Sequence, residues 1–139
     1  MDKITIYCDG GSRGNPGPAA IGIYIKQLNR GYSKFLGKAT NNEAEYQSVI
    51  FALKKIKHLI GGEKAKKLEI EIKTDSELIV KQLNGEYKIK KQNLMPFFIE
   101  IQNLKQDFNK VNFIHIPREE NKEADRMVNK ELDSQSGLF

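Results

Sequence analysis

The sequence predicts an α/β fold in which helices pack on a mixed five-stranded sheet. Three segments of alternating apolar and polar residues come first, and short connections join them, which is typical of an antiparallel meander. Segments with helical periodicity then alternate with two further strand-like segments, giving the element order βββαβααβα. Because strands that alternate with helices favour parallel pairing, the sheet is expected to be mixed.

The N-terminal meander begins with a strand at residues 3–8, where every second residue is apolar. A stretch rich in glycine and proline follows and predicts a turn up to Pro18. The second and third strands are expected at residues 19–25 and 31–37.

The clearest predicted helix covers residues 41–60. Its apolar residues recur at the i, i+3, i+4 and i+7 spacing of a helix that buries one face. Asn41 or Asn42 is expected to cap its N-terminus, and Gly61 is expected to end it. The same periodicities predict a strand at 68–72, a helix at 76–83, a helix at 94–108, a strand at 111–116 and a helix at 121–132.

A chain of 139 residues is expected to form one domain. We predict that residues 1–133 form this domain and that residues 134–139 are a disordered polar tail. The sequence contains no run of 18 apolar residues and no signal-peptide pattern, which favours a cytoplasmic protein that does not enter a membrane. The single cysteine, Cys8, excludes an internal disulfide, and no cluster of cysteine and histidine indicates zinc.

The chain carries a net charge of +5, and its lysines are unevenly placed. One group flanks the glycines at 61 and 62, and a second group surrounds Tyr87: Lys81, Lys88, Lys90 and Lys91. Surface lysines often serve only to solvate a helix. Beside a cluster of carboxylates, however, they favour a polyanionic partner such as a nucleic acid.

Four carboxylates stand near the ends of predicted elements: Asp9, Glu45, Asp75 and Asp125. Each also has a structural explanation, as a turn residue, a helix-dipole partner, a helix cap or a solvated helix charge. Oxygen ligands are those that Mg²⁺ prefers, and Mn²⁺ is a suitable substitute. Two such ions about 3.5–4 Å apart can stabilise the attacking and leaving oxygens of a phosphodiester. Together the four carboxylates therefore favour a metal-dependent site.

The segments that carry these residues, 9–17, 40–46, 73–77 and 120–126, closely resemble the motifs of the type 1 ribonucleases H in order and spacing. The resemblance runs from Ile4 to about Val128. It implies the ribonuclease H fold and an endonuclease that cuts the RNA strand of RNA–DNA hybrids, leaving 5′-phosphate and 3′-hydroxyl ends. It also implies that the catalytic metal ligands are Asp9, Glu45, Asp75 and Asp125.

Substrate-binding residues follow from the same resemblance. Asn15, Asn41 and Asn42 match residues that contact the hybrid in its minor groove, and Ser12 lies in the same glycine-rich segment as Asn15. Amide groups suit this role because they can donate to and accept from 2′-hydroxyls and base edges. Turn formation and helix capping would explain the same residues.

Three further positions correspond to phosphate contacts or to a mobile loop. Thr40 and Ser76 match positions that the family uses to hold a phosphate of the DNA strand, although capping explains both equally well. Arg118 lies where many relatives carry a histidine. Because an arginine cannot act as a general base, we expect it to hold or draw off a phosphate by its charge. The alternative is a surface charge paired with Glu119 or Glu120.

One further departure from the family, a similarity in the C-terminal tail and two alternative functions accompany this prediction. Some members insert a long basic handle containing tryptophan near residues 84–94, and this chain has no tryptophan, so the handle is expected to be absent. Residues 135–139, Gln135 to Phe139, faintly resemble a peptide that docks on a sliding clamp. A monomer is expected.

The alternatives are a nuclease of the same fold that acts on double-stranded RNA or DNA junctions, and a non-catalytic nucleic-acid-binding module.

Overall fold

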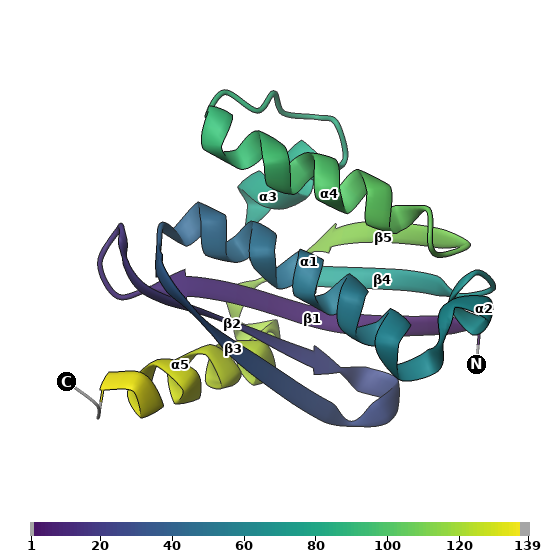
Figure 1. The fold of residues 1–139 in the computed structure, drawn as a ribbon, viewed down its shortest axis with the longest axis horizontal. Helices are drawn as coiled ribbons and strands as arrows, with labels where there is room; N and C mark the ends of the chain where they lie inside the picture. Colours follow the sequence, from purple (N-terminus) through teal and green to yellow (C-terminus); the bar gives the residue numbers. More distant parts are fainter. Residues whose placement is uncertain (1, 137–139) are drawn as a thin grey trace.

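The computed structural model describes residues 2–136 and confirms the mixed five-stranded sheet (Figure 1). The strand order is β3-β2-β1-β4-β5. The antiparallel meander consists of β1 (Lys3–Ser12), β2 (Gly17–Ile25) and β3 (Arg30–Ala39). Two parallel strands complete the sheet: β4 (Glu69–Thr74) pairs with β1, and β5 (Lys110–His115) pairs with β4.

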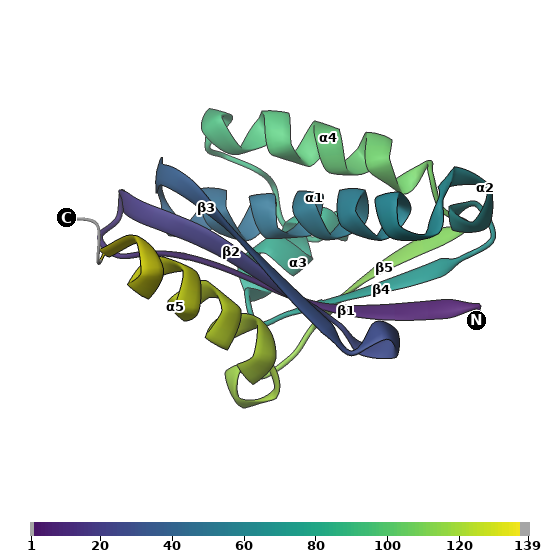
Figure 2. The same cartoon turned by 60° about the horizontal axis from the view of Figure 1, so that its bottom comes forward.

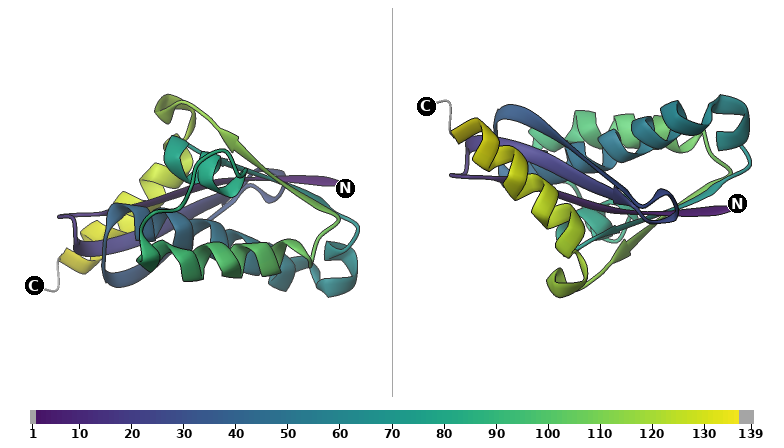
Figure 3. Two further views of the ribbon diagram at one scale, coloured as in Figure 1. Left: turned by 90° about the horizontal axis from the view of Figure 1, so that it is seen from above. Right: turned by 90° about the horizontal axis from the view of Figure 1, so that it is seen from below.

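Helices lie on both faces of this sheet. On one face α1 (Asn41–Ile60) packs with α4 (Met95–Lys105) beside it, and α5 (Lys122–Ser136) lies on the other face (Figure 2). The right-hand view of Figure 3 shows α5 crossing the strands of the meander. The shorter helices α2 (Gly62–Ala65) and α3 (Glu77–Leu83) follow α1 and β4. None of the helices described within residues 2–136 combines the length and the apolar character needed to span a membrane.

Two helical segments differ from the predicted ones. Helix α2 was not expected, because four residues are too few to show a periodicity. The helix predicted at 94–108 is shorter, since a 3-10 helix (Gln92–Leu94) precedes α4 and Phe108 packs into the core from beyond the helix end. Residues 84–91, all of which are described, form no helix or strand, so the basic handle is absent, as expected.

The main core lies between α1 and the inner face of the sheet. From β1 it receives Ile4, Ile6 and Cys8, the alternating residues that the sequence pattern placed on one face. Burying each large apolar side chain contributes about 1.5–3 kcal/mol. Tyr46 of α1 is fully buried, and its hydroxyl donates a 2.6 Å hydrogen bond to Gln82 Oε1. This bond joins α1 to α3 through the core.

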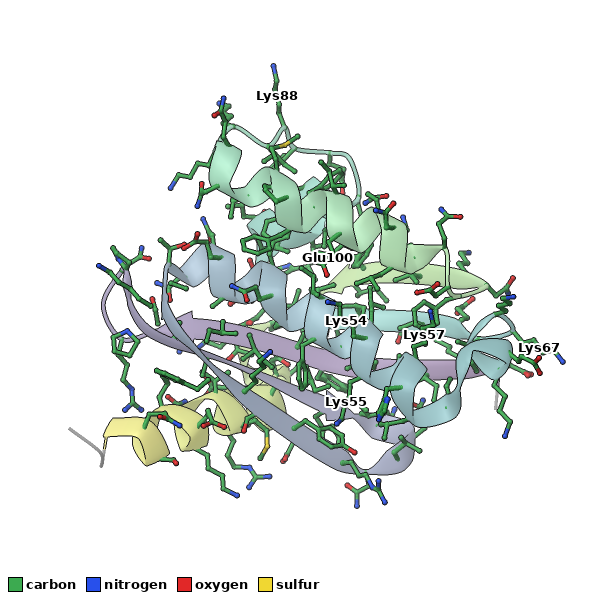
Figure 4. All side chains as sticks on the ribbon, viewed as in Figure 1. Lys54, Lys55, Lys57, Lys67, Lys88 and Glu100 are labelled. Atoms are coloured by element: carbon green, nitrogen blue, oxygen red, sulfur yellow. The ribbon has the colours of Figure 1, made fainter. Side chains whose placement is uncertain are left out.

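Ion pairs join α1 to α4 and to the turn after it. Lys54 Nζ lies 2.8 Å from Glu100 Oε2, and Lys57 Nζ lies 3.1 Å from Asp107 Oδ2 (Figure 4). Exposed pairs of this kind are each worth at most about 1 kcal/mol. Part of the lysine-rich surface found in the sequence is therefore engaged within the fold.

Helix α1 is capped by Thr40, and not by Asn41 or Asn42 as the sequence suggested. Thr40 Oγ1 accepts a 3.1 Å hydrogen bond from the Glu43 N–H, and Glu43 Oε1 accepts one of 2.8 Å from the Thr40 N–H. This reciprocal capping box satisfies two backbone donors and determines where the helix begins. The two asparagines consequently lie in the first turn of the helix with their side chains available for other contacts.

Strand β1 extends beyond the strand predicted at 3–8. Gly10 and Gly11 indicated a turn, but they continue the ladder with β2. Pairing between β1 and β4 stops at Tyr7 and Lys73, so β2 alone flanks the last residues of β1. Asp9 therefore lies inside β1 and not at its end, on an edge that β4 leaves open.

Helix α5 packs closely on the meander at Gly22. A Cβ atom at this position would lie 2.5 Å from the Ala124 carbonyl oxygen and 2.6 Å from Met127 Cβ. Further along the helix, Ser33 Oγ of β3 donates a 2.9 Å hydrogen bond to Glu131 Oε1. The close contact at Gly22 and this bond together set the position of α5 on the sheet.

The C-terminal end of α5 meets the segment that the sequence assigned to a tail. The helix continues to Ser136, past the domain boundary predicted at residue 133, and Gln135 Nε2 donates to Glu131 Oε2 at 3.2 Å. Residues 137–139 lie outside the described part of the chain. The peptide expected to dock on a sliding clamp therefore begins within α5, and its remainder is not described.

The contact at Gly22 generates a test of how α5 is held. We expect Gly22→Ala to lower the midpoint of thermal unfolding by several degrees, because the added methyl group fits only if α5 moves, at a cost of about 1–3 kcal/mol. Melts followed by circular dichroism measure this. Gly62→Ala is the control, since its Cβ would meet only Lys57 Cε, at 3.8 Å. Equal melting of the two variants would contradict close packing at Gly22.

Candidate active site

The structure brings the four singled-out carboxylates to one end of the sheet. One oxygen from each of Asp9, Glu45 and Asp75 lies within 4.8 Å of the others. Asp125, on α5, lines the same cavity of about 410 Å³. The four residues come from β1, α1, the position after β4, and α5, so segments far apart in the sequence form one acidic site.

Two features of the fold bring these carboxylates together. At Gly10, β1 passes so close to α1 that a Cβ atom would lie 2.3 Å from the Ala44 carbonyl oxygen. Glu45, the next residue of α1, accepts a hydrogen bond from the Gly10 backbone. Because β1 and β4 are parallel and point to the same edge of the sheet, Asp75 follows the end of β4 close to Asp9.

Burial and mutual repulsion raise the pKa of two of these carboxylates. The pKa of Asp9 rises from 3.8 to about 7, first because burial desolvates the side chain and then because Asp75 and Asp125 are close. The pKa of Glu45 lies well above its usual value, first because burial desolvates the side chain and then because Asp9 and Asp75 are close. Within residues 2–136, no lysine or arginine forms an ion pair with any of the four. The site therefore carries negative charge that the described side chains do not neutralise.

The donor set fits a hard divalent cation. All the converging ligand atoms are carboxylate oxygens, which Mg²⁺ and Mn²⁺ prefer. The nearby Cys8 is fully buried, and burial raises the pKa of its thiol well above the usual value, so it stays protonated and is a poor metal ligand. A dication among these oxygens would offset the repulsion that raises the pKa of Asp9.

Two polar residues that the sequence analysis did not single out contact the carboxylates. Thr74 Oγ1 donates a long hydrogen bond, 3.5 Å, to Glu45 Oε2. Asn121 Nδ2 donates to Asp75 Oδ1 at 3.2 Å. Asn121 precedes Asp125 by four residues, a spacing that places both on one side of a helix start. That spacing relates Asn121 to Asp125 but does not indicate its contact with Asp75, so the sequence offered no specific signal for Asn121.

The β1–β2 turn and the start of α1 interlock at the rim of the cavity. Asn15 Oδ1 accepts a 2.9 Å hydrogen bond from the Asn41 N–H. Asn41 Oδ1 in turn accepts from the Ser12 N–H at 2.9 Å and from its hydroxyl at 3.2 Å. Both amide oxygens are thus used within the protein, whereas no described residue accepts from the side-chain NH₂ group of either asparagine. Ser12 and Asn41 line the cavity.

The other substrate-binding residues singled out in the sequence lie outside this cavity. Thr40 caps α1, and Ser76 Oγ caps α3 by accepting a 3.4 Å hydrogen bond from the Ile79 N–H. Asn42 faces a separate hollow of about 420 Å³. The lysines that line this second hollow are Lys88, Lys90 and Lys91.

Arg118 also lines the carboxylate cavity. It begins a 3-10 helix (Arg118–Glu120) that leads into α5. Among the described residues it forms no ion pair with Glu119 or Glu120, the partners of the alternative interpretation. Its charge is therefore available at the cavity.

The chain is similar to known ribonucleases H along almost its entire length. A family model described as reverse transcriptase-like matches residues 7–131. Among curated proteins, a ribonuclease HI of Halobacterium salinarum is 35% identical over 135 residues, which are 94% of this chain and 65% of that protein. A bifunctional protein of Mycobacterium tuberculosis is 35% identical over 137 residues, which are 95% of this chain and 36% of that protein. The chain thus spans only part of these relatives.

A solved structure gives the same result in three dimensions. The crystal structure of LC11-RNase H1 in complex with an RNA/DNA hybrid superposes with a TM-score of 0.87 and 42% sequence identity, covering 95% of this chain and 98% of that one. The strand order, the converging carboxylates and these similarities agree. The chain belongs to the type 1 ribonuclease H family.

Proposed function

We propose that this protein is an endoribonuclease that hydrolyses the RNA strand of RNA–DNA hybrids and leaves 5′-phosphate and 3′-hydroxyl ends. The observation that carries the proposal is the cluster of Asp9, Glu45 and Asp75, whose oxygens lie within 4.8 Å of one another in a cavity open to solvent. Membership of the ribonuclease H family supports it, as does the hybrid bound to a relative that is 42% identical.

The four carboxylates are proposed as the ligands of Mg²⁺, with Mn²⁺ as a substitute. When bound, such an ion supplies Lewis-acid polarisation of a phosphodiester and lowers the pKa of an attacking water. Asp9, with 9% of its surface exposed, would hold the ion together with Glu45 and Asp75. Asp125 is outside the set of oxygens within 4.8 Å and acts on Asp9 by its charge, so it has the more peripheral role.

The rim residues are proposed to read the hybrid through its minor groove. Since the side-chain oxygens of Asn15 and Asn41 accept bonds within the protein, their NH₂ groups face outward as donors. Every base pair presents acceptors in the minor groove, and each ribose adds a 2′-hydroxyl. Donors of this kind bind a hybrid without selecting its sequence. Ser12 completes this surface at the cavity rim.

Phosphate contacts are proposed for three residues. Arg118 places a permanent positive charge at the carboxylate cavity and would hold the cleaved phosphate or draw it off. Thr40 and Ser76 each stand at a helix N-terminus, where backbone donors favour an anion, and their hydroxyls already accept the capping bonds. Any contact with DNA phosphates would therefore use the free hydroxyl protons.

Removal of single carboxylates tests the proposed chemistry. Asp9→Asn and Asp75→Asn are expected to lower hybrid cleavage by about 10³-fold or more, since each removes a charge that holds the metal. Asp125→Asn is expected to lose less and to be partly restored by Mn²⁺. The measurement is single-turnover cleavage of a labelled hybrid across a Mg²⁺ series. Asp107→Asn, which alters an ion pair with Lys57 in another part of the fold, is the matched control.

Four outcomes would contradict the proposal. Full activity of Asp75→Asn would remove the metal assignment, and cleavage by the wild type in excess EDTA would remove the metal requirement. Double-stranded RNA and DNA junctions are assayed beside the hybrid. A preference for either would support the alternative nuclease, and metal-independent binding without cleavage would support a non-catalytic module.

The raised pKa of Asp9 predicts how stability depends on pH without metal. Because the folded-state pKa of about 7 exceeds the unfolded value of about 3.9, the folded protein binds the proton more tightly, and stability falls as the pH rises from 4 to 7. In EDTA, the wild type should melt several degrees higher at pH 5 than at pH 7.5. Asp9→Asn should melt above the wild type at pH 7.5 and show a flatter pH profile. A wild-type melting point that rises with pH over this range would contradict the prediction.

The hollow beside Asn42 predicts where the basic surface contributes. Lys88 projects from the loop after α3, away from the body of the protein (Figure 4). Replacing Lys88, Lys90 and Lys91 by alanine should weaken hybrid binding and reduce the slope of log affinity against log salt by up to about one per lost phosphate contact. The control variant replaces Lys64, Lys66 and Lys67, which lie at the opposite end of α1. If the two triple variants show equal slopes, Lys88, Lys90 and Lys91 contact no phosphate and serve only to solvate the surface.

A further inference from the structure

Asn121 is almost completely buried next to the carboxylate cluster, with only 1% of its surface exposed. Its Nδ2 donates two hydrogen bonds, one of 2.8 Å to the Cys8 carbonyl oxygen and one of 3.2 Å to Asp75 Oδ1. Cys8 precedes Asp9 in β1, and Asp75 follows β4. A single buried amide therefore connects β1, which carries Asp9, with Asp75, the residue that follows β4.

The orientation of this amide follows from its partners. A carbonyl oxygen and a carboxylate oxygen are both acceptors, so only the NH₂ group can face them, and a flipped amide would oppose oxygen to oxygen. The consequence is that Asn121 Oδ1 is buried and has no hydrogen-bond partner among residues 2–136, which the structure describes. An unpaired buried acceptor is unfavourable, and groups of this kind call for an explanation. The two bonds donated by Nδ2 therefore determine how the side chain is placed.

Helix capping does not explain Asn121. It stands immediately before α5, where an asparagine ordinarily caps the helix because its Oδ1 accepts a bond from a backbone N–H in the first turn. Here no N–H of the described part of the chain donates to Oδ1. The backbone oxygen of Asn121 accepts a 3.1 Å hydrogen bond from the Asp125 N–H, and its backbone N–H donates one of 3.0 Å to the Arg118 carbonyl oxygen. The same residue thus contacts Asp75 through its side chain and Asp125 through its backbone.

We propose that Asn121 is a positioning residue that holds Asp75 and the first turn of α5 where the carboxylates bind a divalent cation. This inference rests on the metal site of the proposed function. A neutral amide suits the task because it orients Asp75 without adding a positive charge that would compete with the ion. It also engages Oδ1 alone and leaves Oδ2 of Asp75 for other contacts. Loss of such a supporting group typically weakens metal binding by about 10–100-fold.

The test separates positioning from folding by means of two variants. Asn121→Ser keeps a hydroxyl that can cap α5 but is too short to reach both Cys8 and Asp75, whereas Asn121→Ala removes every side-chain bond. Binding of Mn²⁺ to the full chain without nucleic acid is measured at 10 °C by electron paramagnetic resonance. We expect about tenfold or weaker binding for both variants, with the serine variant melting close to the wild type.

Asn84→Ser is the matched control, because Asn84 Nδ2 also donates to a strand carbonyl, that of Phe113 at 3.2 Å, and touches no carboxylate. Wild-type Mn²⁺ affinity in folded Asn121→Ser, or an equal loss in Asn84→Ser, would overturn the proposal. Hybrid cleavage is measured in parallel, and excess Mg²⁺ should restore much of the kcat of Asn121→Ser with little change in KM. A wild type that binds Mn²⁺ but leaves hybrid intact would overturn the proposed activity, and the Mn²⁺ comparison would still decide the role of Asn121.

Discussion

The close approach of α1 to β1 at Gly10 is the contact on which the acidic site depends. No side chain fits there, because a Cβ atom would lie 2.3 Å from the Ala44 carbonyl oxygen. The contact carries Glu45 over the open edge of β1, next to Asp9, and it buries much of both side chains. Desolvation is accordingly the largest cause of the raised pKa of these two carboxylates. The same geometry that brings the carboxylates together makes the cluster unfavourable when no metal ion is bound.

The rest of the fold holds this unfavourable cluster in place. On one face, the core between α1 and the sheet buries Tyr46, whose hydroxyl is satisfied by Gln82. On the other face, α5 packs at Gly22 too closely for any side chain. Packing on both faces stabilises the fold more than the repulsion between the carboxylates destabilises it. The unfavourable cluster can therefore persist at a functional site. Asn121, buried between β1, β4 and α5, lies where these layers meet.

The basic residues separate into two groups with different surroundings. Lys54 and Lys57 pair with acidic residues of α4 and the turn after it, and Lys55 lies 4.4 Å above the ring of Tyr32. These three lysines therefore make contacts within the protein that stabilise the fold. By contrast, the lysines at 88, 90 and 91 surround the hollow beside Asn42 and have no ion-pair partner among the described residues. In the proposed function, a polyanion would thus meet free positive charge beside Asn42, while its scissile phosphate would face the acidic cluster.

The sequence by itself determined the element order, the faces of the main helices and the identity of the four carboxylates. Periodicity is a local property, and the core residues of β1 and α1 follow it closely. The order and spacing of the motifs are likewise visible in the sequence without the structure. The prediction was wrong where contacts with distant residues override a local sequence pattern. Gly10 and Gly11 indicated a turn, but pairing with β2 keeps them in a strand.

Only the tertiary structure decided which atoms meet. The capping box at Thr40, rather than an asparagine cap, leaves Asn41 to join Ser12 and Asn15 at the cavity rim. Asn42 faces a different hollow, although it is the next residue in the chain. Asn121 drew no attention in the sequence, because its importance lies in partners 113 and 46 residues away. Contacts over such separations depend on strand pairing and layer packing, which no local pattern encodes.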